Sequence, residues 1–364
     1  MNSTGNKLSF IQISMMLMLT IGLTSHVIVN PMILDASGRD AWISVIITGL
    51  IYCPWCGVLL LIMKKSGQQK LQPWLAQQTT PLLSWILMAP FIAQLYLMGG
   101  MTVLHTSIWT VTNYLPATPK LVLITVLTLI CQYAAKIGIR AITIASGILL
   151  PTVVLLGFFV AVSNVPEKNY QLLKPYLEHG WQLPINGMIY AGSGFVEIVI
   201  LLFMQHHLKS QVKYWMLLAL SAIIVGITLG PVIGAITEFG PQEAAKQMTS
   251  PYEQWRLVKL GDYIEHVDFL SVYQWLSGSC VRISLSLFLL GDVLPITTRK
   301  GRNIVLAAVT LSYISLSMLP INQNDYYLWT YRYYFPGALI ITLICTTLWA
   351  GFSLWTRKTK EKPT

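Results

Sequence analysis

Ten long, mostly apolar stretches, separated by short polar segments, dominate this sequence. A helix needs about 20 such residues to cross a bilayer, where every backbone polar group must be bonded within the protein. Only 10% of the 364 residues are charged, against about 25% in an ordinary soluble domain. The sequence therefore predicts an all-α polytopic membrane protein and excludes an ordinary water-soluble enzyme.

The predicted spans form a single membrane domain over residues 1–364. They run over approximately 10–34, 41–63, 82–113, 121–136, 140–164, 185–207, 212–237, 267–293, 303–321 and 336–356. The first stretch is long, starts behind a polar leader, and shows no small-residue cleavage site before the next span. It is therefore predicted to be a membrane helix and not a removable signal peptide.

The distribution of positive charge predicts the orientation. With the N-terminus inside, 15 of the 24 Lys and Arg residues fall in the cytoplasm, 8 fall outside, and Arg282 lies within a span. Because cytoplasmic loops carry the excess of Lys and Arg, both termini are predicted to be cytoplasmic, with 357–364 as a basic tail. The same scatter of charges through apolar blocks argues against a nucleic-acid partner and makes the lipid bilayer the expected surroundings.

The outer segment 238–266 mixes charges with Tyr252, Trp255 and Leu260. This composition predicts a short amphipathic helix lying on the extracytoplasmic face. Two interpretations stay open, namely a partner-binding surface and a solvated cover over the helix bundle.

Small and polar residues interrupt the first and sixth spans at comparable places. The first reads Thr20-Ile21-Gly22-Leu23-Thr24-Ser25-His26, and the sixth contains Gly192-Ser193-Gly194. In transporter folds, discontinuous helices at mid-membrane expose backbone groups that bind substrate or ions. We therefore expect helix breaks at Gly22 and at Gly192 and Ser193. The alternative is that these residues only allow helices to pack closely.

Four ionisable residues lie well inside the predicted spans: His26, His105, Glu197 and Arg282. Charges are costly in a bilayer and are functional candidates by default. One possibility is that Glu197 and Arg282 pair with each other. Another is that both bind a ligand, in which case Arg282 binds its carboxylate and Glu197 binds an amine or a proton. A structural pair without a ligand is the third possibility. His105 is expected to form a hydrogen bond within the bundle. For His26 two interpretations stay open, namely lining a pocket and bonding within the bundle.

Two further motifs are predicted to carry no chemistry. The adjacent His206 and His207 would point about 100° apart on a regular helix, which argues against a shared metal ion. Cys53 and Cys56 have the spacing of a redox motif but lie in an apolar span, where two buried thiols beside a proline are expected instead. No metal, cofactor or catalytic residue is predicted, and no enzyme motif is present.

The sequence resembles the B subunits of bacterial spore germinant receptors, also called endospore germination permeases. This family lies within the amino acid–polyamine–organocation transporter superfamily. The resemblance covers essentially the whole chain and is specific through the order and spacing of its motifs. These are the stretch ending in Pro31, then Asp35–Ser44, Leu173–Gly180, Gly194–Glu197, Gly261–Asp268 leading to Trp275, Leu319-Pro320, and Asp325–Tyr334.

The resemblance implies ten helices in a five-plus-five inverted repeat, with helices 1 and 6 broken at mid-membrane. The first repeat covers about 10–164 and the second about 185–356. It further implies a nutrient-sensing subunit in the inner membrane of the spore, which binds an amino acid or a sugar. An A-type membrane subunit and a C-type lipoprotein are the implied partners in starting germination.

The same resemblance implies a ligand site assembled from four spans. Its members are Thr24, Ser25, His26, Tyr96, Gly99, Gly100, Gly194, Phe195, Glu197, Ser279, Arg282 and Ser286. The chain departs from the family pattern at Thr24, where many members have Gly, and at Arg282, where smaller or aromatic residues are common. A proton- or sodium-coupled amino acid transporter is the alternative function, because it needs a similar pocket. A scaffold whose pocket has become vestigial is a third possibility.

Overall fold

The computed structural model of the protein describes residues 7–259, 266–296 and 298–355. Within these ranges the regular structure is helical and includes no strand, apart from one isolated bridge between Leu8 and Leu208. Among the described residues, eight helical stretches are long and apolar enough to cross a membrane. The predicted all-α class is thus confirmed.

The helices of the first half begin near the N-terminus and follow one another with short connections. They are α1 (Phe10–Gly22), a π-helix (Leu23–Ile28), α2 (Asn30–Ser37), α3 (Ala41–Lys65), α4 (Leu71–Gln78), α5 (Pro81–Asn113), α6 (Lys120–Ile137) and α7 (Ile139–Ser163). Short 3₁₀ turns occupy Gly38–Asp40, Val165–Glu167 and Tyr170–Leu173.

The second half starts with a span built from several helical pieces. These are α8 (Gln182–Phe195), a 3₁₀ turn (Val196–Val199), α9 (Ile200–Met204) and a second 3₁₀ turn (Gln205–His207). The following helices are α10 (Tyr214–Phe239), α11 (Pro241–Ala244), α12 (Ser250–Arg256), α13 (Leu270–Val293), α14 (Arg299–Ser317) and α15 (Gln323–Trp329). A π-helical turn (Thr330–Tyr334) then leads into α16 (Phe335–Leu354).

The structure gives eight candidate spans where the sequence predicts ten. One of the eight is the nearly continuous helical stretch Phe10–Lys65, which covers the first two predicted spans. The predicted span 303–321 corresponds to α14, which is not among the eight. Three cations, Arg299, Lys300 and Arg302, stand in the first turn of α14 and lower its apolar character. The five-plus-five repeat accordingly stays a prediction.

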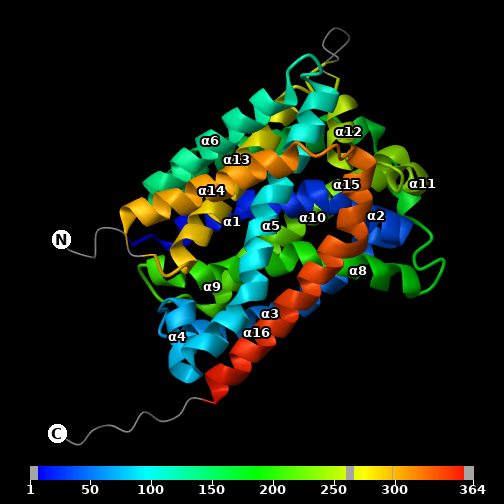
Figure 1. Cartoon of the computed structure of the whole chain (residues 1–364). Coiled ribbons are helices and arrows are strands. Elements are labelled where there is room, and N and C mark those ends of the chain that lie inside the picture. Colours follow the sequence, from blue (N-terminus) through cyan, green and yellow to red (C-terminus); the bar gives the residue numbers. More distant parts are fainter. Residues whose placement is uncertain (1–6, 260–265, 297, 356–364) are drawn as a thin grey trace, which may run out of the picture.

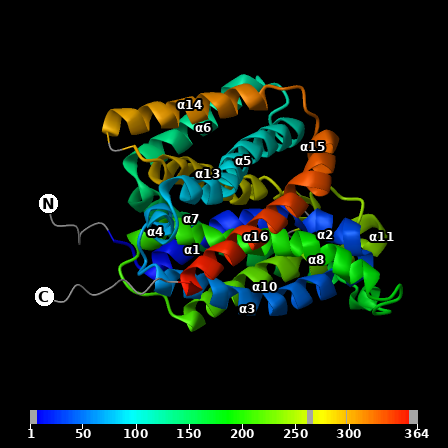
Figure 2. The same cartoon turned by 60° about the horizontal axis from the view of Figure 1, so that its bottom comes forward.

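Two spans form the centre of the bundle. In the stretches Gln182–His207 and Leu270–Val293, 89% and 78% of the most apolar window is buried, whereas the other candidate spans have 17–44% buried. Helix α8 packs against α2 and α3, and α13 packs against α5, α6 and α7. Figure 2 shows α14 and α6 along one side of the bundle and α3, α8 and α10 along the other. The two central spans carry Glu197 and Arg282, so both charges are placed in the core.

The short helices gather at the two ends of the bundle. Helix α4 lies at the end where α1 begins and α16 finishes, which we call the terminal end (Figure 1). Helices α11, α12 and α15 lie at the opposite end. The predicted amphipathic segment 238–266 therefore contains two short helices, with Tyr252 and Trp255 buried. Its residues 260–265 and the whole of the predicted tail 357–364 lie outside the described residues.

Both spans with predicted breaks depart from α-helical geometry but stay helical. Gly22 is the last residue of α1, and the wider π-helical turn follows it, with the N–H of Val29 bonded to the carbonyl of Thr24 at 2.8 Å. Gly192 and Ser193 lie inside α8, so the departure there begins only at Val196. The sequence placed it too early, because these two residues serve packing. Ser193 Oγ donates to the carbonyls of Ile189 and Phe335 at 2.6 and 2.8 Å.

Among the described glycines, Gly187 of α8 has the closest neighbours. A Cβ built there would lie 1.9 Å from Ser37 Oγ and 2.7 Å from Ser44 Oγ. We expect Gly187→Ala to destabilise the protein by about 1–3 kcal/mol, the usual cost of overpacking. Thermal unfolding of the detergent-solubilised protein measures the loss. Gly230→Ala on the exposed face of α10, where no atom lies within 4 Å, is the matched control. Equal melting temperatures for the two variants would contradict the close contact of Gly187 with Ser37 and Ser44.

Candidate functional site

Glu197 and Arg282 form a two-pronged ion pair in the core. Arg282 Nη1 donates to Glu197 Oε2 at 2.5 Å, and Nη2 donates to Oε1 at 2.6 Å. The side chains are only 8% and 2% exposed, respectively. A planar guanidinium matches a carboxylate in this fork geometry, which makes the pair both strong and directional. Of the alternatives that the sequence leaves open, the structure has the two charges paired with each other.

Neighbouring hydroxyl and carbonyl groups complete the bonding of this pair. Arg282 Nε donates to Thr102 Oγ1 of α5 at 3.0 Å, and Nη1 also donates to the backbone carbonyl of Thr20 at 3.2 Å. Thr24 Oγ1, in the π-helical turn, donates to Glu197 Oε2 at 3.0 Å. The pair thus joins four segments: α1 with its π-helix, α5, the 3₁₀ turn after α8, and α13. A relative shift of any of these segments strains at least one of the bonds.

A buried hydroxyl without a partner among the described residues follows Thr24 in the π-helical turn. Ser25 is fully buried, and its Oγ has no hydrogen-bond partner among the described residues. A Cβ built on Gly194 would lie 2.7 Å from this oxygen. Buried polar groups are nearly always bonded, so the orphan Ser25 hydroxyl is an exception that sets this crossing of the π-helical turn and α8 apart.

An aromatic layer separates the ion pair from the end that carries α11, α12 and α15. His105 stacks on Tyr326 with ring centroids 4.7 Å apart and lies 4.9 Å from Trp275, which stacks on Trp109 at 4.0 Å. Trp275 precedes Arg282 by seven residues on the same helix, about 10 Å along its axis. This layer therefore forms one boundary of the polar centre.

Four of the predicted site residues gather instead between α5, α13 and α14. They are Tyr96, Gly99, Gly100 and Ser286, and they share one neighbour, Tyr313 of α14. A Cβ on Gly99 would lie 2.5 Å from the Tyr313 hydroxyl, which itself donates to the carbonyl of Tyr96 at 2.9 Å. Ser286 Oγ donates to the carbonyl of Leu95 at 2.6 Å. These contacts hold helices together, and no hydrogen bond links them to the ion pair.

The remaining three predicted site residues face other neighbours. His26 Nδ1 lies 3.1 Å from the carbonyl of Ile227 on α10. The ring of Phe195 packs against Tyr52 with centroids 5.5 Å apart. Ser279 Oγ is bonded to Thr106 Oγ1 at 2.9 Å, below the aromatic layer. The predicted set is therefore spread over several contacts, and Thr24, Ser25, Gly194, Glu197 and Arg282 form its compact part.

Sequence reasoning missed the two threonines that complete the centre. Thr20 contributes a carbonyl to Arg282, and Thr102 contributes a hydroxyl. Hydroxyls on membrane helices commonly bond the carbonyl four residues back, and both threonines also make that bond, with Met16 and Met98. Thr102 offered only a weak signal, since it lies three residues before His105 in a helix that carries several other hydroxyl side chains, such as Thr106 and Ser107.

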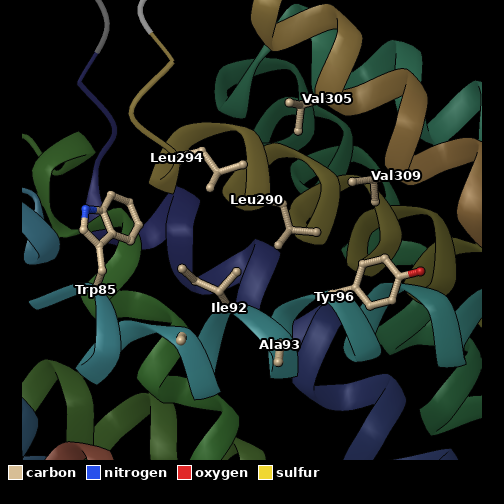
Figure 3. A pocket seen from close by; sticks show the side chains of 9 residues that line it. Trp85, Ile92, Ala93, Tyr96, Leu290, Leu294, Val305 and Val309 are labelled. Atoms are coloured by element: carbon tan, nitrogen blue, oxygen red, sulfur yellow. The ribbon is translucent and has the colours of Figure 1, made fainter. Parts of the chain in front are cut away.

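A cavity of about 640 Å³ lies between α5, α13 and α14, away from the ion pair. Its lining is apolar apart from the hydroxyl of Tyr96 and the indole N–H of Trp85 (Figure 3). Ile92, Leu290 and Val309 converge on it from three helices. None of its lining residues is charged, so the cavity offers no counter-charge to a charged ligand.

The comparisons with known proteins agree with the resemblance. A family model described as "Spore germination protein" matches residues 7–326. The chain belongs to the spore germination protein family. It is 41% identical over 354 residues to spore germination protein XB of Bacillus anthracis, covering 97% of this chain and 99% of that protein. It is also 23% identical over 267 residues to the putative spore germination protein YfkT of Bacillus subtilis (strain 168), covering 71% of each.

Membership of this family and the apolar helices together make the chain a multi-pass membrane protein of spore germination. Its family is a permease type and not an enzyme family. The five cysteines, which include Cys53 and Cys56 within α3, are free thiols.

Proposed function

We propose that the chain is the germinant-sensing membrane subunit of a spore germination receptor. Its ligand would be a small nutrient, an amino acid or a sugar, bound beside the Glu197–Arg282 pair. The observation that carries this proposal is the pair itself, because a permease-type protein keeps two opposite charges in its core next to the unpartnered Ser25 hydroxyl. Intramembrane charges of this kind mark ligand and ion pathways.

The chemistry of the pair favours a zwitterionic ligand. An amino acid presents a carboxylate that suits Arg282 and an ammonium group that suits Glu197. Binding would replace one internal ion pair with two ligand ion pairs, so no buried charge is left without a partner. Glu197 and Arg282 would then separate, and the helices that they join would move apart. The ligand shifts the protein toward this separated arrangement only as far as it binds that arrangement more tightly than the paired one.

The wider arrangement follows the family. We infer ten spans in a five-plus-five inverted repeat, with the π-helical turn 23–28 and the 3₁₀ turn 196–199 as the distorted centres of spans one and six. Both termini would be cytoplasmic, in the inner membrane of the spore. The partners would be the A-type membrane subunit and the C-type lipoprotein, which receive the conformational signal.

Direct binding tests the proposed site. Purified full-length protein in detergent is titrated with amino acids and with sugars, and bound ligand is measured by calorimetry. We expect saturable binding of an amino acid that Arg282→Met weakens at least tenfold, because the carboxylate loses its fork of donors. Arg256→Met is the matched control, since Arg256 pairs with Glu253 at 3.0 Å on the exposed surface of α12.

Two results would contradict the proposal. Equal affinity in the Arg282 and Arg256 variants would remove Arg282 from the ligand site. Absence of any saturable ligand would favour a structural scaffold. Accumulation of labelled amino acid in proteoliposomes, driven by a proton or sodium gradient, would instead support the coupled transporter, for which Glu197 is the candidate proton carrier.

A further inference from the structure

Two adjacent histidines converge at the terminal end of the bundle. The sequence predicted that the rings of His206 and His207 diverge by about 100°, and this is wrong. Helix α9 ends at Met204, residues Gln205–His207 form a tight 3₁₀ turn, and the chain then becomes extended at Leu208. The two imidazole rings consequently lie close together, with centroids 4.0 Å apart and planes tilted by 41°.

A carboxylate oxygen lies between these two rings. Asp292 Oδ2, near the end of α13, is 3.0 Å from Nε2 of His206 and 3.6 Å from Nε2 of His207. One ligand atom from each of the three residues falls within 4.8 Å of the others. Two ligands of a tetrahedral zinc ion, each about 2.0–2.2 Å from the metal, lie about 3.4 Å apart. The observed separations bracket this value.

The two Nε2 atoms are buried, and Asp292 Oδ2 is the partner that approaches them, at 3.0 and 3.6 Å. Within the described part of the chain, no other group forms a hydrogen bond with either nitrogen. The other carboxylate oxygen, Oδ1, accepts from Lys70 Nζ at 2.9 Å, and Lys70 also donates to the backbone carbonyl of Asp292 at 3.1 Å. Lys70 therefore orients the carboxylate and leaves Oδ2 free toward the histidines. Outer contacts of this type fix the orientation of metal ligands.

We propose that His206, His207 and Asp292 bind a divalent transition-metal ion of the zinc class. Two imidazole nitrogens and one carboxylate oxygen form a ligand set that zinc accepts, and a fourth position is left for water. The side chains are 16%, 22% and 13% exposed, so an ion can reach the site from the terminal end without unfolding the bundle.

The bound ion would join the two central spans a second time. His206 and His207 are the last two residues of the span that carries Glu197, and Asp292 is the last residue but one of the span that carries Arg282. The ion pair links these spans near their middle, and the metal would link them at the terminal end. Occupancy would therefore restrain a separation of the two spans, whatever ligand the centre binds.

Metal binding to the purified full-length protein tests the site. The protein is stripped with a chelator and dialysed against Zn²⁺, and bound metal is counted by elemental analysis. Co²⁺ replaces zinc in a parallel sample to give the visible absorption of a tetrahedral site. We expect one zinc ion per chain. His206→Gln and His207→Gln should each weaken zinc binding by at least tenfold. Loss of a residue that only orients a metal ligand already costs about tenfold in metal affinity, and a ligand itself should cost no less.

His179→Gln and His266→Gln are the matched controls, since both histidines lie outside the candidate spans and report adventitious binding. Gel filtration establishes that each variant is folded, and the two histidine ligands give independent variants. The proposal is overturned if the wild type binds no zinc beyond what these controls explain. It is equally overturned if both ligand variants keep wild-type affinity.

Discussion

Glu197→Gln is expected to lower the free energy of unfolding by about 3–5 kcal/mol, the cost of leaving a buried charge without its partner. Arg282 is 2% exposed, and its guanidinium would keep only the Thr102 hydroxyl and the Thr20 carbonyl as full acceptors beside a neutral amide. Thermal and denaturant unfolding of the detergent-solubilised protein measure the loss. The germinant response should disappear together with the ion pair.

A double variant shows whether the instability comes from an unpaired buried charge or from lost packing. Replacing a whole buried pair with apolar residues of similar size is often neutral or stabilising. Glu197→Leu combined with Arg282→Met should therefore recover most of the stability while the response stays absent. Glu253→Gln, which breaks the exposed pair with Arg256, should change stability by less than about 1 kcal/mol. If Glu197→Gln changed the free energy of unfolding as little as this control does, Glu197 and Arg282 would not form a buried ion pair.

Gly194→Trp is expected to abolish the germinant response at every ligand concentration while the protein is still made. The Cβ of any residue at this position starts 2.7 Å from Ser25 Oγ and 3.4 Å from Val29 Cγ2. An indole would fill the space beside the ion pair and push the π-helical turn away from α8. Spore germination, followed as loss of optical density against germinant concentration, measures the response, and immunoblotting measures the amount of subunit.

Smaller substitutions at the same crossing give a graded test. Gly194→Ala meets the Ser25 hydroxyl, so combining it with Ser25→Ala removes the contacting oxygen and should restore part of the response. Gly230→Trp on the exposed face of α10 is the control for a bulky residue, because no atom lies within 4 Å of a Cβ there. A normal response in Gly194→Trp spores would place the ligand elsewhere.

The helical class and the positions of most spans could be predicted because both follow from composition over about 20 residues. Glu197 and Arg282 stood out for the same reason, since a charge is conspicuous in an apolar span. Their mutual contact was one of several alternatives, because sequence spacing alone does not place a residue of the sixth span against one of the eighth. The structure resolves that choice with two bonds of 2.5 and 2.6 Å.

Other features needed the three-dimensional arrangement. Gly192 and Ser193 suggested a break, but small residues in membrane helices also permit close packing, and Gly187 and Gly194 of the same helix do so. Tyr313 contacts four predicted site residues with its ring and hydroxyl, yet nothing in the local sequence distinguishes it from other tyrosines. The convergence of His206 and His207 depends on a 3₁₀ turn that the apolar pattern does not encode.

The ion pair also constrains how the chain is made. Glu197 precedes Arg282 by 85 residues, so the span that carries Glu197 is synthesised and enters the membrane before Arg282 is synthesised. During that interval the sixth span carries an unpaired acidic group, and Thr24 of the first span is the hydroxyl already available to it. The ion pair between the two central spans can form only after the span Leu270–Val293 has been inserted. Truncation of the chain before Arg282 should therefore leave a nascent product that membrane quality-control proteases recognise and remove.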